Sequence, residues 1–317
     1  MTTAPPVARP ADPAADPAYD HTVDRAWVHR HAVSEVFVTD ASAAGDGSFV
    51  VAAQLPRKHW FYTDHPAVQG VVDPLLLQEC ARQAVTVVAH RYLAVPMQTS
   101  ALVTSWRAEL PRGLRNGDQP VQLRLLVTPH DLRERDGQAI GVRFTAELSL
   151  DGEPAGSTEI GAAYLPREQY RDFRALRRST PPPSSADLPG RGGTDLVSPA
   201  SVGRSVGDHV VLGDLRSVGE EVVATLDAPP RHPSLYDHPL DHVPGMVLME
   251  AARQLTLLVL GSPSHEVTGL DATFSRFAEL DAPVRVTGAR VPGGVRVGFE
   301  QGGASVAGCT VSAEVLG

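Results

Sequence analysis

The stretch Asp73-Pro-Leu-Leu-Leu-Gln-Glu-Cys-Ala-Arg-Gln-Ala-Val-Thr-Val-Val-Ala-His-Arg-Tyr-Leu93 predicts one long helix. Its aspartate is a favourable N-cap, and proline suits the first helical position. Apolar residues cover most of the helical circumference, which indicates a buried helix. The remaining polar residues recur at helical spacing and form one stripe, which comprises Glu79, Arg82, Gln83 and Thr86. Because burying charge is costly, this stripe is the first candidate for a functional site.

The same stripe recurs further along the chain. Pro244-Gly-Met-Val-Leu-Met-Glu-Ala-Ala-Arg-Gln-Leu-Thr-Leu-Leu-Val-Leu260 contains Glu250, Arg253 and Gln254. Each lies 171 residues after its counterpart in the first stretch (250 − 79, 253 − 82 and 254 − 83). Two copies of one Glu-x-x-Arg-Gln helix indicate an internal duplication.

Alternating or β-branched segments surround both helices and predict strands. In the first copy these are residues 34–39, 48–55, 101–110, 121–128, 139–150 and 153–165, and in the second they are residues 210–212, 221–226, 273–280, 295–299 and 305–313. The predicted class is α+β, with an antiparallel sheet around each helix. We expect a disordered tail (1–27), a first unit (28–166), a linker that starts with a short surface helix (167–200) and a second unit (201–317).

Composition excludes several classes of protein. The chain has 317 residues and a net charge of −9, which argues against a general nucleic-acid-binding protein. Its two cysteines, Cys80 and Cys309, provide neither a disulfide framework nor a zinc motif, and no metal-ligand cluster is evident. The first residues lack the apolar core of a signal peptide, and no apolar run is long enough to span a membrane. We therefore expect a cytoplasmic protein.

The motifs resemble known families. Residues 244–254 are similar to the "PGVL-x-x-EA-x-x-Q" helix of hotdog dehydratases that act on acyl-carrier-protein thioesters. Leu55-Pro-Arg-Lys-His59, Tyr62-Thr-Asp-His-Pro66 and Tyr236-Asp-His-Pro-Leu-Asp-His-Val-Pro-Gly245, with a Glu-x-x-Arg-Gln helix after each loop, resemble the A-factor biosynthesis (AfsA-type) family more closely. That resemblance covers about residues 28–317 and implies a tandem hotdog fold. Trp60-Phe61 depart from the family pattern and are expected to reshape the first pocket.

The resemblance also implies an activity. Members of the family join a β-ketoacyl thioester to the hydroxyl of dihydroxyacetone phosphate, in the synthesis of γ-butyrolactone, butenolide or furan signalling molecules. The expected partners are therefore a β-ketoacyl group on acyl carrier protein or CoA and dihydroxyacetone phosphate, with no cofactor. Two alternatives are a hotdog dehydratase or thioesterase and a non-catalytic protein that binds acyl ligands. The chain is expected to be a monomeric double hotdog or a homodimer.

Paired hotdog units place their helices side by side and form sites from both units. The resemblance therefore favours Glu79 with Arg253 in one site, with Glu250 and Arg82 as the alternative pair. A desolvated glutamate of raised pKa would act as the base, and a bidentate arginine would bind phosphate. The structural alternative is an ion pair between residues i and i+3 within each helix.

Other polar residues are secondary candidates. His65 and His238 lie in Asp-His-Pro loops, where each either acts as an acid or base near the acyl carbonyl or stabilises its loop by hydrogen bonds. Gln83 and Gln254 bind substrate or satisfy buried polar groups. The candidates for phosphate or carrier-protein binding are Arg57, Lys58 and Arg276, for which solvated surface charge is the alternative. Either helix N-terminus could donate a backbone N–H to a thioester oxygen.

Overall fold

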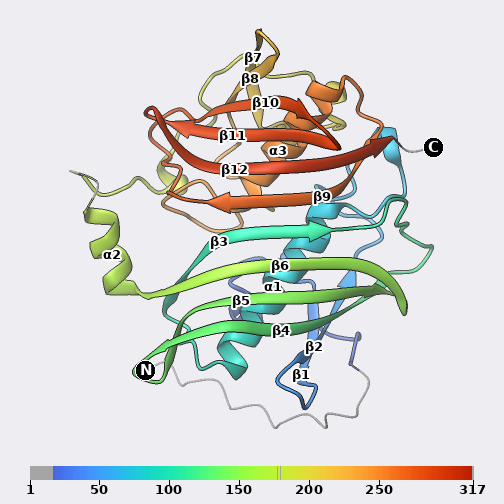
Figure 1. Cartoon of the computed structure of the whole chain (residues 1–317), viewed down its shortest axis with the longest axis vertical. Coiled ribbons are helices and arrows are strands. Elements are labelled where there is room, and N and C mark those ends of the chain that lie inside the picture. Colours follow the sequence, from blue (N-terminus) through green and yellow to red (C-terminus); the bar gives the residue numbers. More distant parts are fainter. Residues whose placement is uncertain (1–16, 177, 179, 316–317) are drawn as a thin grey trace.

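The computed structural model describes residues 17–176, 178 and 180–315, which form one large antiparallel sheet with two helices behind it (Figure 1). The first unit contributes β1 (Val38–Ala43), β2 (Phe49–Leu55), β3 (Thr99–Glu109), β4 (Val121–Arg135), β5 (Gln138–Leu150) and β6 (Glu153–Pro166). The second contributes β7 (Leu212–Val218), β8 (Glu221–Leu226), β9 (His265–Phe274), β10 (Arg285–Val291), β11 (Gly294–Gln301) and β12 (Ala304–Val315). The predicted α+β tandem hotdog fold is confirmed.

The strand order of the sheet reflects the duplication. The order is β1-β2-β4-β5-β6-β3-β9-β12-β11-β10-β8-β7, so the second half repeats the first in reverse. The units join where β3 pairs with β9, with Trp106 opposite Ala272. Two related half-sheets that meet edge to edge leave their helices neighbours on the same face, which brings α1 and α3 together.

The two central helices form as predicted. The first, α1, spans Pro74–Tyr92, and the carboxylate of Asp73 caps it by accepting from Leu75 N at 2.7 Å. The second, α3, spans Gly245–Leu260 and has no side-chain cap at its N-terminus. Both helices are buried along most of their length because the sheet curves around them.

Several observed strands differ from the predicted ones, and β7 lies almost entirely after the strand predicted at 210–212. Residues 33–35 form a 3-10 turn, so β1 starts four residues later than expected, at Val38, and continues to Ala43, beyond the predicted end at residue 39. The strand predicted at 273–280 lies mainly before that range, as β9, because residues 265–274 pair with both β3 and β12. Strand β10 was not predicted. Gly288 interrupts its pattern, because a Cβ there would lie 2.9 Å from Leu255 of α3.

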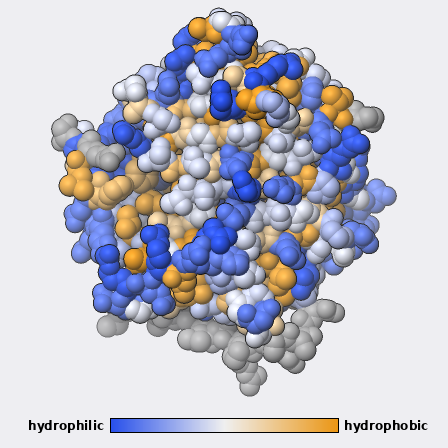
Figure 2. Space-filling view, in the orientation of Figure 1, coloured by the Kyte–Doolittle hydropathy of each residue, from blue (hydrophilic) through white to orange (hydrophobic). Residues whose placement is uncertain are grey.

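The expected tail and linker make specific contacts. Residues 1–16 lie outside the described part of the chain, whereas Val23 N donates to Val38 O at 3.0 Å. Helix α2 (Arg167–Ala175) lies at one edge of the molecule, where the exposed Phe173 and Leu176 contribute to an apolar area (Figures 1 and 2). Ser185 is buried and its N–H donates to Leu240 O at 2.8 Å. The boundaries at 28, 166 and 200 stay a proposal.

Among the described residues, no helix is both long enough and apolar enough to cross a membrane.

Candidate active site

Glu79 lies at the centre of an ion cluster in the first unit. Its carboxylate is fully buried and accepts from Arg82 through two atoms, Nε at 2.8 Å and Nη2 at 2.7 Å. Arg30 adds a contact from Nη2 at 2.6 Å, and Gln83 Nε2 donates at 2.7 Å. Charge-assisted bonds of this length are strong, so they stabilise a buried carboxylate.

The second unit builds the same cluster. Glu250 is fully buried and contacts Arg253 Nη2 at 2.7 Å and Arg204 Nη2 at 2.9 Å. Arg204 corresponds to Arg30, at an offset of 174 residues. Sequence reasoning missed both arginines. The signal was present, however, because Val28-His-Arg30 is repeated as Val202-Gly-Arg204.

These contacts correct two expectations about the glutamates. Each glutamate pairs with the arginine of its own helix, so Glu79 does not bond Arg253 and Glu250 does not bond Arg82. The expected rise in pKa is also wrong. Burial alone would raise the pKa of Glu79, but Arg30 and Arg82 outweigh it and lower the pKa to about 2. The glutamates therefore stay ionised and position arginines instead of taking up protons.

The two predicted glutamines connect helices to neighbouring segments. Gln83 Oε1 accepts from Phe37 N at 2.9 Å, and its amide donates to Glu35 O at 2.7 Å. Gln254 makes the equivalent bonds, from Val211 N at 3.0 Å and to His209 O at 2.7 Å. All four bonds satisfy buried backbone groups, which is the structural alternative for both residues.

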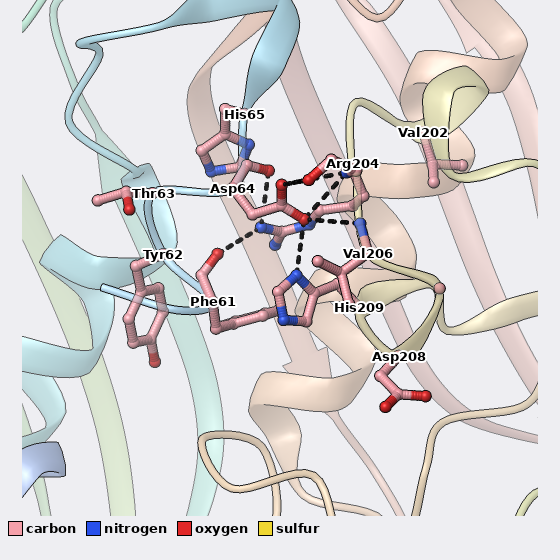
Figure 3. A network of polar contacts seen from close by, with 12 residues as sticks. Phe61, Tyr62, Thr63, Asp64, His65, Val202, Arg204, Val206, Asp208 and His209 are labelled. Carbon is pink, nitrogen blue, oxygen red and sulfur yellow. Dashed lines mark hydrogen bonds and ion pairs between the residues drawn. The ribbon is translucent and has the colours of Figure 1, made fainter. Parts of the chain in front are cut away.

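The aspartates of the Asp-His-Pro loops link the two units, and Figure 3 shows this link for the Asp64 loop. Asp64 accepts from Ser205 N, Val206 N and His209 Nδ1, the last at 2.7 Å. Asp237 does the same in reverse, accepting from His31 N at 2.6 Å and Ala32 N at 2.9 Å. Each loop thus fixes the arginine-bearing segment of the other unit, so both ion clusters depend on both units.

The N-terminal ends of the two helices differ. At α1, His65 is buried and its Nε2 lies 2.6 Å from Asp73 Oδ2, which closes that end. At α3, the position of Asp73 is occupied by Pro244, and His238 lies instead 3.3 Å from Asp237 with a side chain that is 28% exposed. The α3 end is therefore the more accessible one.

Loop residues reinforce this difference. Phe61 is buried against the guanidinium of Arg204, whose Cζ lies 4.3 Å from the ring centroid. Its counterpart beside Arg30, at an offset of 173, is the small Ser234, whose carbonyl lies 3.4 Å from Arg30 Nη1. Trp60 stacks on His232, with ring centroids 5.0 Å apart. The bulk of Phe61 thus fills space at the α1 end, whereas Trp60 is 48% exposed.

A cavity of about 600 Å³ lies at the α3 end, between the units. Its polar wall contains Arg82 and Thr86 of α1, together with His29 and His90. The loop before α3 and the first residues of that helix form another wall. Apolar residues of β3 and β6 complete it, among them Leu102, Val103, Ile160 and Tyr164.

The cavity contains only some of the predicted site residues. Arg82, His238 and Arg276 line it. Glu79 and Gln83 lie behind Arg82, and Glu250, Arg253, Gln254 and His65 belong to the closed α1 end. Arg57 and Lys58 are exposed beyond β2 and do not line the cavity. Sequence reasoning missed His29 and His90 because neither belongs to the repeated motif.

Comparisons with known proteins identify the family of this chain. The family model for the A-factor biosynthesis hotdog domain matches residues 11–166 and 189–316. A relative from Streptomyces virginiae, "2-oxo-3-(phosphooxy)propyl 3-oxoalkanoate synthase", is 33% identical over 86% of this chain and 88% of its own length. A protein of the same name from Streptomyces griseus is 30% identical over 90% of this chain and 93% of its own.

Solved structures share the fold at low sequence identity. The pyran synthase domain from module nine of the sorangicin pathway is 15% identical, with a TM-score of 0.52, over 89% of this chain and 98% of its own. A putative oleoyl thioesterase from Lactobacillus plantarum is 11% identical, with a TM-score of 0.51, over 86% and 98%. Together with the duplicated ion clusters, the family match shows that this chain belongs to the A-factor biosynthesis hotdog family.

Proposed function

We propose that this protein transfers a β-ketoacyl group from a thioester to the hydroxyl of dihydroxyacetone phosphate, in the synthesis of a γ-butyrolactone-type signalling molecule. The observation that carries this function is the cavity at the α3 end, which has a cationic wall and an apolar wall. The printed names of the relatives describe the expected product, a 3-oxoalkanoate ester of a phosphooxypropyl ketone. The acyl donor would be carried by acyl carrier protein or CoA.

Arg82 is the proposed phosphate ligand. Its described hydrogen bonds use Nε and Nη2, to Glu79 and to Val28 O, which leaves Nη1 for the cavity. Its side chain is 20% exposed, against 6% for Arg253 in the closed end. The bonds to Glu79 and Val28 hold the Arg82 guanidinium in one orientation at the cavity. A planar, fixed guanidinium with one free N–H edge suits a phosphate dianion.

The N-terminus of α3 is the proposed site for the thioester carbonyl. Gly245 and Met246 line the cavity, and no side chain caps this helix. The first N–H groups of a helix lack intrahelical partners and attract negative charge. They could stabilise the oxyanion that forms when a hydroxyl attacks the acyl carbon. His238 lines the same cavity and is a secondary candidate for a group that contacts the acyl carbonyl.

Apolar residues are proposed to bind the acyl chain. Val103 of β3, Ile160 of β6 and Phe277 line the cavity. Burying an alkyl chain there contributes about 0.8 kcal/mol per methylene, which favours donors with longer acyl chains over acetyl donors. A cavity of this size is in the usual range for small-molecule sites.

The function is tested by incubating the purified chain with a β-ketoacyl thioester, with and without dihydroxyacetone phosphate. We expect a phosphorylated ester by mass spectrometry and thiol release only when both substrates are present. Dihydroxyacetone without phosphate is the matched control and should react poorly, because it lacks the group that binds Arg82. Thiol release that does not require dihydroxyacetone phosphate would instead support a thioesterase. Saturable binding of the acyl thioester without turnover would support a ligand-binding protein.

A further inference from the structure

Two histidines of the cavity have no counterpart in the duplication. His29 and His90 line the cavity, and the equivalent residues of the second unit are Gly203 and Gly261, at offsets of 174 and 171. His29 has a φ of 54°, in the left-handed region, and Gly203 shares this conformation with a φ of 69°. A histidine here occupies a backbone that favours glycine, which is a cost that often accompanies function.

The hydrogen bonds of the pair define where its protons lie. His90 Nδ1 is 2.8 Å from Val95 O, and because a carbonyl only accepts, this nitrogen must carry a proton. In the neutral ring, Nε2 of His90 is then an acceptor. His29 Nε2 lies 2.8 Å from it and must donate. The remaining nitrogen, His29 Nδ1, therefore carries a lone pair and has no other hydrogen-bond partner among the described residues.

The surroundings keep His29 neutral. Burial, with the nearby His90, Arg82 and His238, lowers the pKa of His29 to about 3. The cavity thus contains a neutral imidazole next to the proposed phosphate ligand. A phosphate dianion at Arg82 would offset one of the opposing charges and make His29 more basic when substrate is bound. Binding of the phosphotriose would thereby prepare the base for the reaction.

The carboxylates nearest to Arg82 already accept hydrogen bonds. Glu79 is enclosed by its arginines, and the carboxylate of Asp237 accepts from His31 N, Ala32 N and His238 Nδ1. His242 Nδ1 bonds Asp241 at 2.7 Å. Among the histidines that line the cavity, His29 is the one whose Nε2–H is bound by a second cavity histidine, His90, which directs its free Nδ1 to the site shared with Arg82.

We propose that His29 is the general base of the acyl transfer and that His90 positions it; this inference rests on the proposed function. His29 Nδ1 takes the hydroxyl proton of dihydroxyacetone phosphate as the oxygen attacks the thioester carbon. The new C–O bond forms, the C–S bond breaks and the proton passes from His29 to the departing sulfur, giving ester and free thiol. While His29 is charged, its Nε2–H donates to His90 Nε2, which Val95 O orients.

The main test replaces His29 by glycine, the residue that the second unit has on the same backbone. We expect His29→Gly to fold normally and to lose about 10²- to 10⁴-fold in kcat, the usual contribution of a general base. The KM for dihydroxyacetone phosphate should change by no more than about threefold, because Arg82 is intact. Added imidazole should restore part of the activity, with a pH dependence that follows its own titration.

Variants of His90 test the positioning role. His90→Phe removes the acceptor for His29 Nε2–H and should lower kcat and alter the pH profile of kcat/KM, whereas His90→Gln keeps an acceptor and should recover part of the rate. His130→Ala is the control, since His130 bonds Thr145 in the β4–β5 hairpin away from the cavity.

The outcomes separate this inference from the function. If the unmodified chain forms no ester from the two substrates, the proposed function and the inference both fail. If the unmodified chain forms ester and His29→Gly is equally active, only the inference fails. A loss of activity that imidazole does not restore, with an unchanged pH profile, would likewise overturn the role of His29 as a base.

Discussion

The N-terminal ends of α1 and α3 have the same backbone design but different accessibility. Both have a buried glutamate between two arginines and an Asp-His-Pro loop that fixes the other unit. The α1 end is closed by the His65–Asp73 bond and by Phe61, whereas the α3 end has Pro244 and Ser234 at these positions and leaves a cavity. The repeated residues therefore build the frame, and the residues that differ between the copies decide where chemistry can occur.

The largest expected effect compares the two helix arginines. Arg82→Met should lower kcat/KM for dihydroxyacetone phosphate by about 10³-fold, or roughly 4 kcal/mol, because the phosphate loses its charged ligand. Both changes should reduce the free energy of unfolding by about 3 kcal/mol, because each removes part of the compensation of a buried glutamate, Glu79 or Glu250. For Arg253→Met, the activity per folded molecule should change little.

Steady-state kinetics and urea unfolding of both variants measure this contrast. Equal losses of activity would mean that the closed end also binds substrate, and the proposal of a single working site would be wrong.

The second prediction concerns a substitution that should close the α3 end. Pro244→Asp gives α3 the cap that α1 has, with His238 nearby as His65 is near Asp73. We expect a gain of about 1 kcal/mol in stability from the cap and the helix dipole. Activity should fall about 10- to 100-fold, because the carboxylate would occupy the N–H groups needed by the oxyanion. Thermal unfolding and initial rates measure both effects, and unchanged turnover would remove the α3 N-terminus from the mechanism.

The two central helices could be predicted from the sequence because their Glu-x-x-Arg-Gln motif is repeated. The offset of 171 residues identified both helices, and the Asp73-Pro74 pair located the start of α1 within one residue. Strand β10 and the start of β9 were missed because Gly288 and Gly269 interrupt their alternation, although packing against α3 and Ser312 favours glycine there. Local pattern does not reveal such close tertiary approaches.

The site was harder to predict for the same reason. Repetition drew attention to Glu79 and Glu250, whose burial and arginine partners make them permanent anions. His29 and His90 are 61 residues apart in sequence and absent from the second copy, so no spacing connects them. The contact between the two side chains depends on the left-handed backbone conformation of His29, which sequence propensity does not predict for a histidine.

The smallest expected effect is a pH dependence of stability that both ends share. Burial, with nearby charges, lowers the pKa of His29 at the open end and of His232 at the closed end to about 3. Since both pKa values lie below that of an unfolded histidine, the unfolded chain binds more protons, and stability falls as the pH drops below about 6.5. Each histidine should cost about 2 kcal/mol between pH 7 and pH 5.

The free energies of unfolding of His29→Gly and His232→Asn at pH 7 and pH 5 measure the contribution of each histidine. The stability of each variant should depend less on pH than that of the unmodified chain. His232 Nδ1 accepts from Ser234 N and Leu235 N, so asparagine preserves an acceptor while removing the titrating ring. Inorganic phosphate should reduce the contribution of His29 to the pH dependence of stability, because an anion at Arg82 offsets a positive charge that opposes the protonation of His29. It should leave the contribution of His232 unchanged, because His232 faces Arg204 behind Phe61. A phosphate effect on the contribution of His232 would show that anions also reach the closed end, contrary to the division between the two ends.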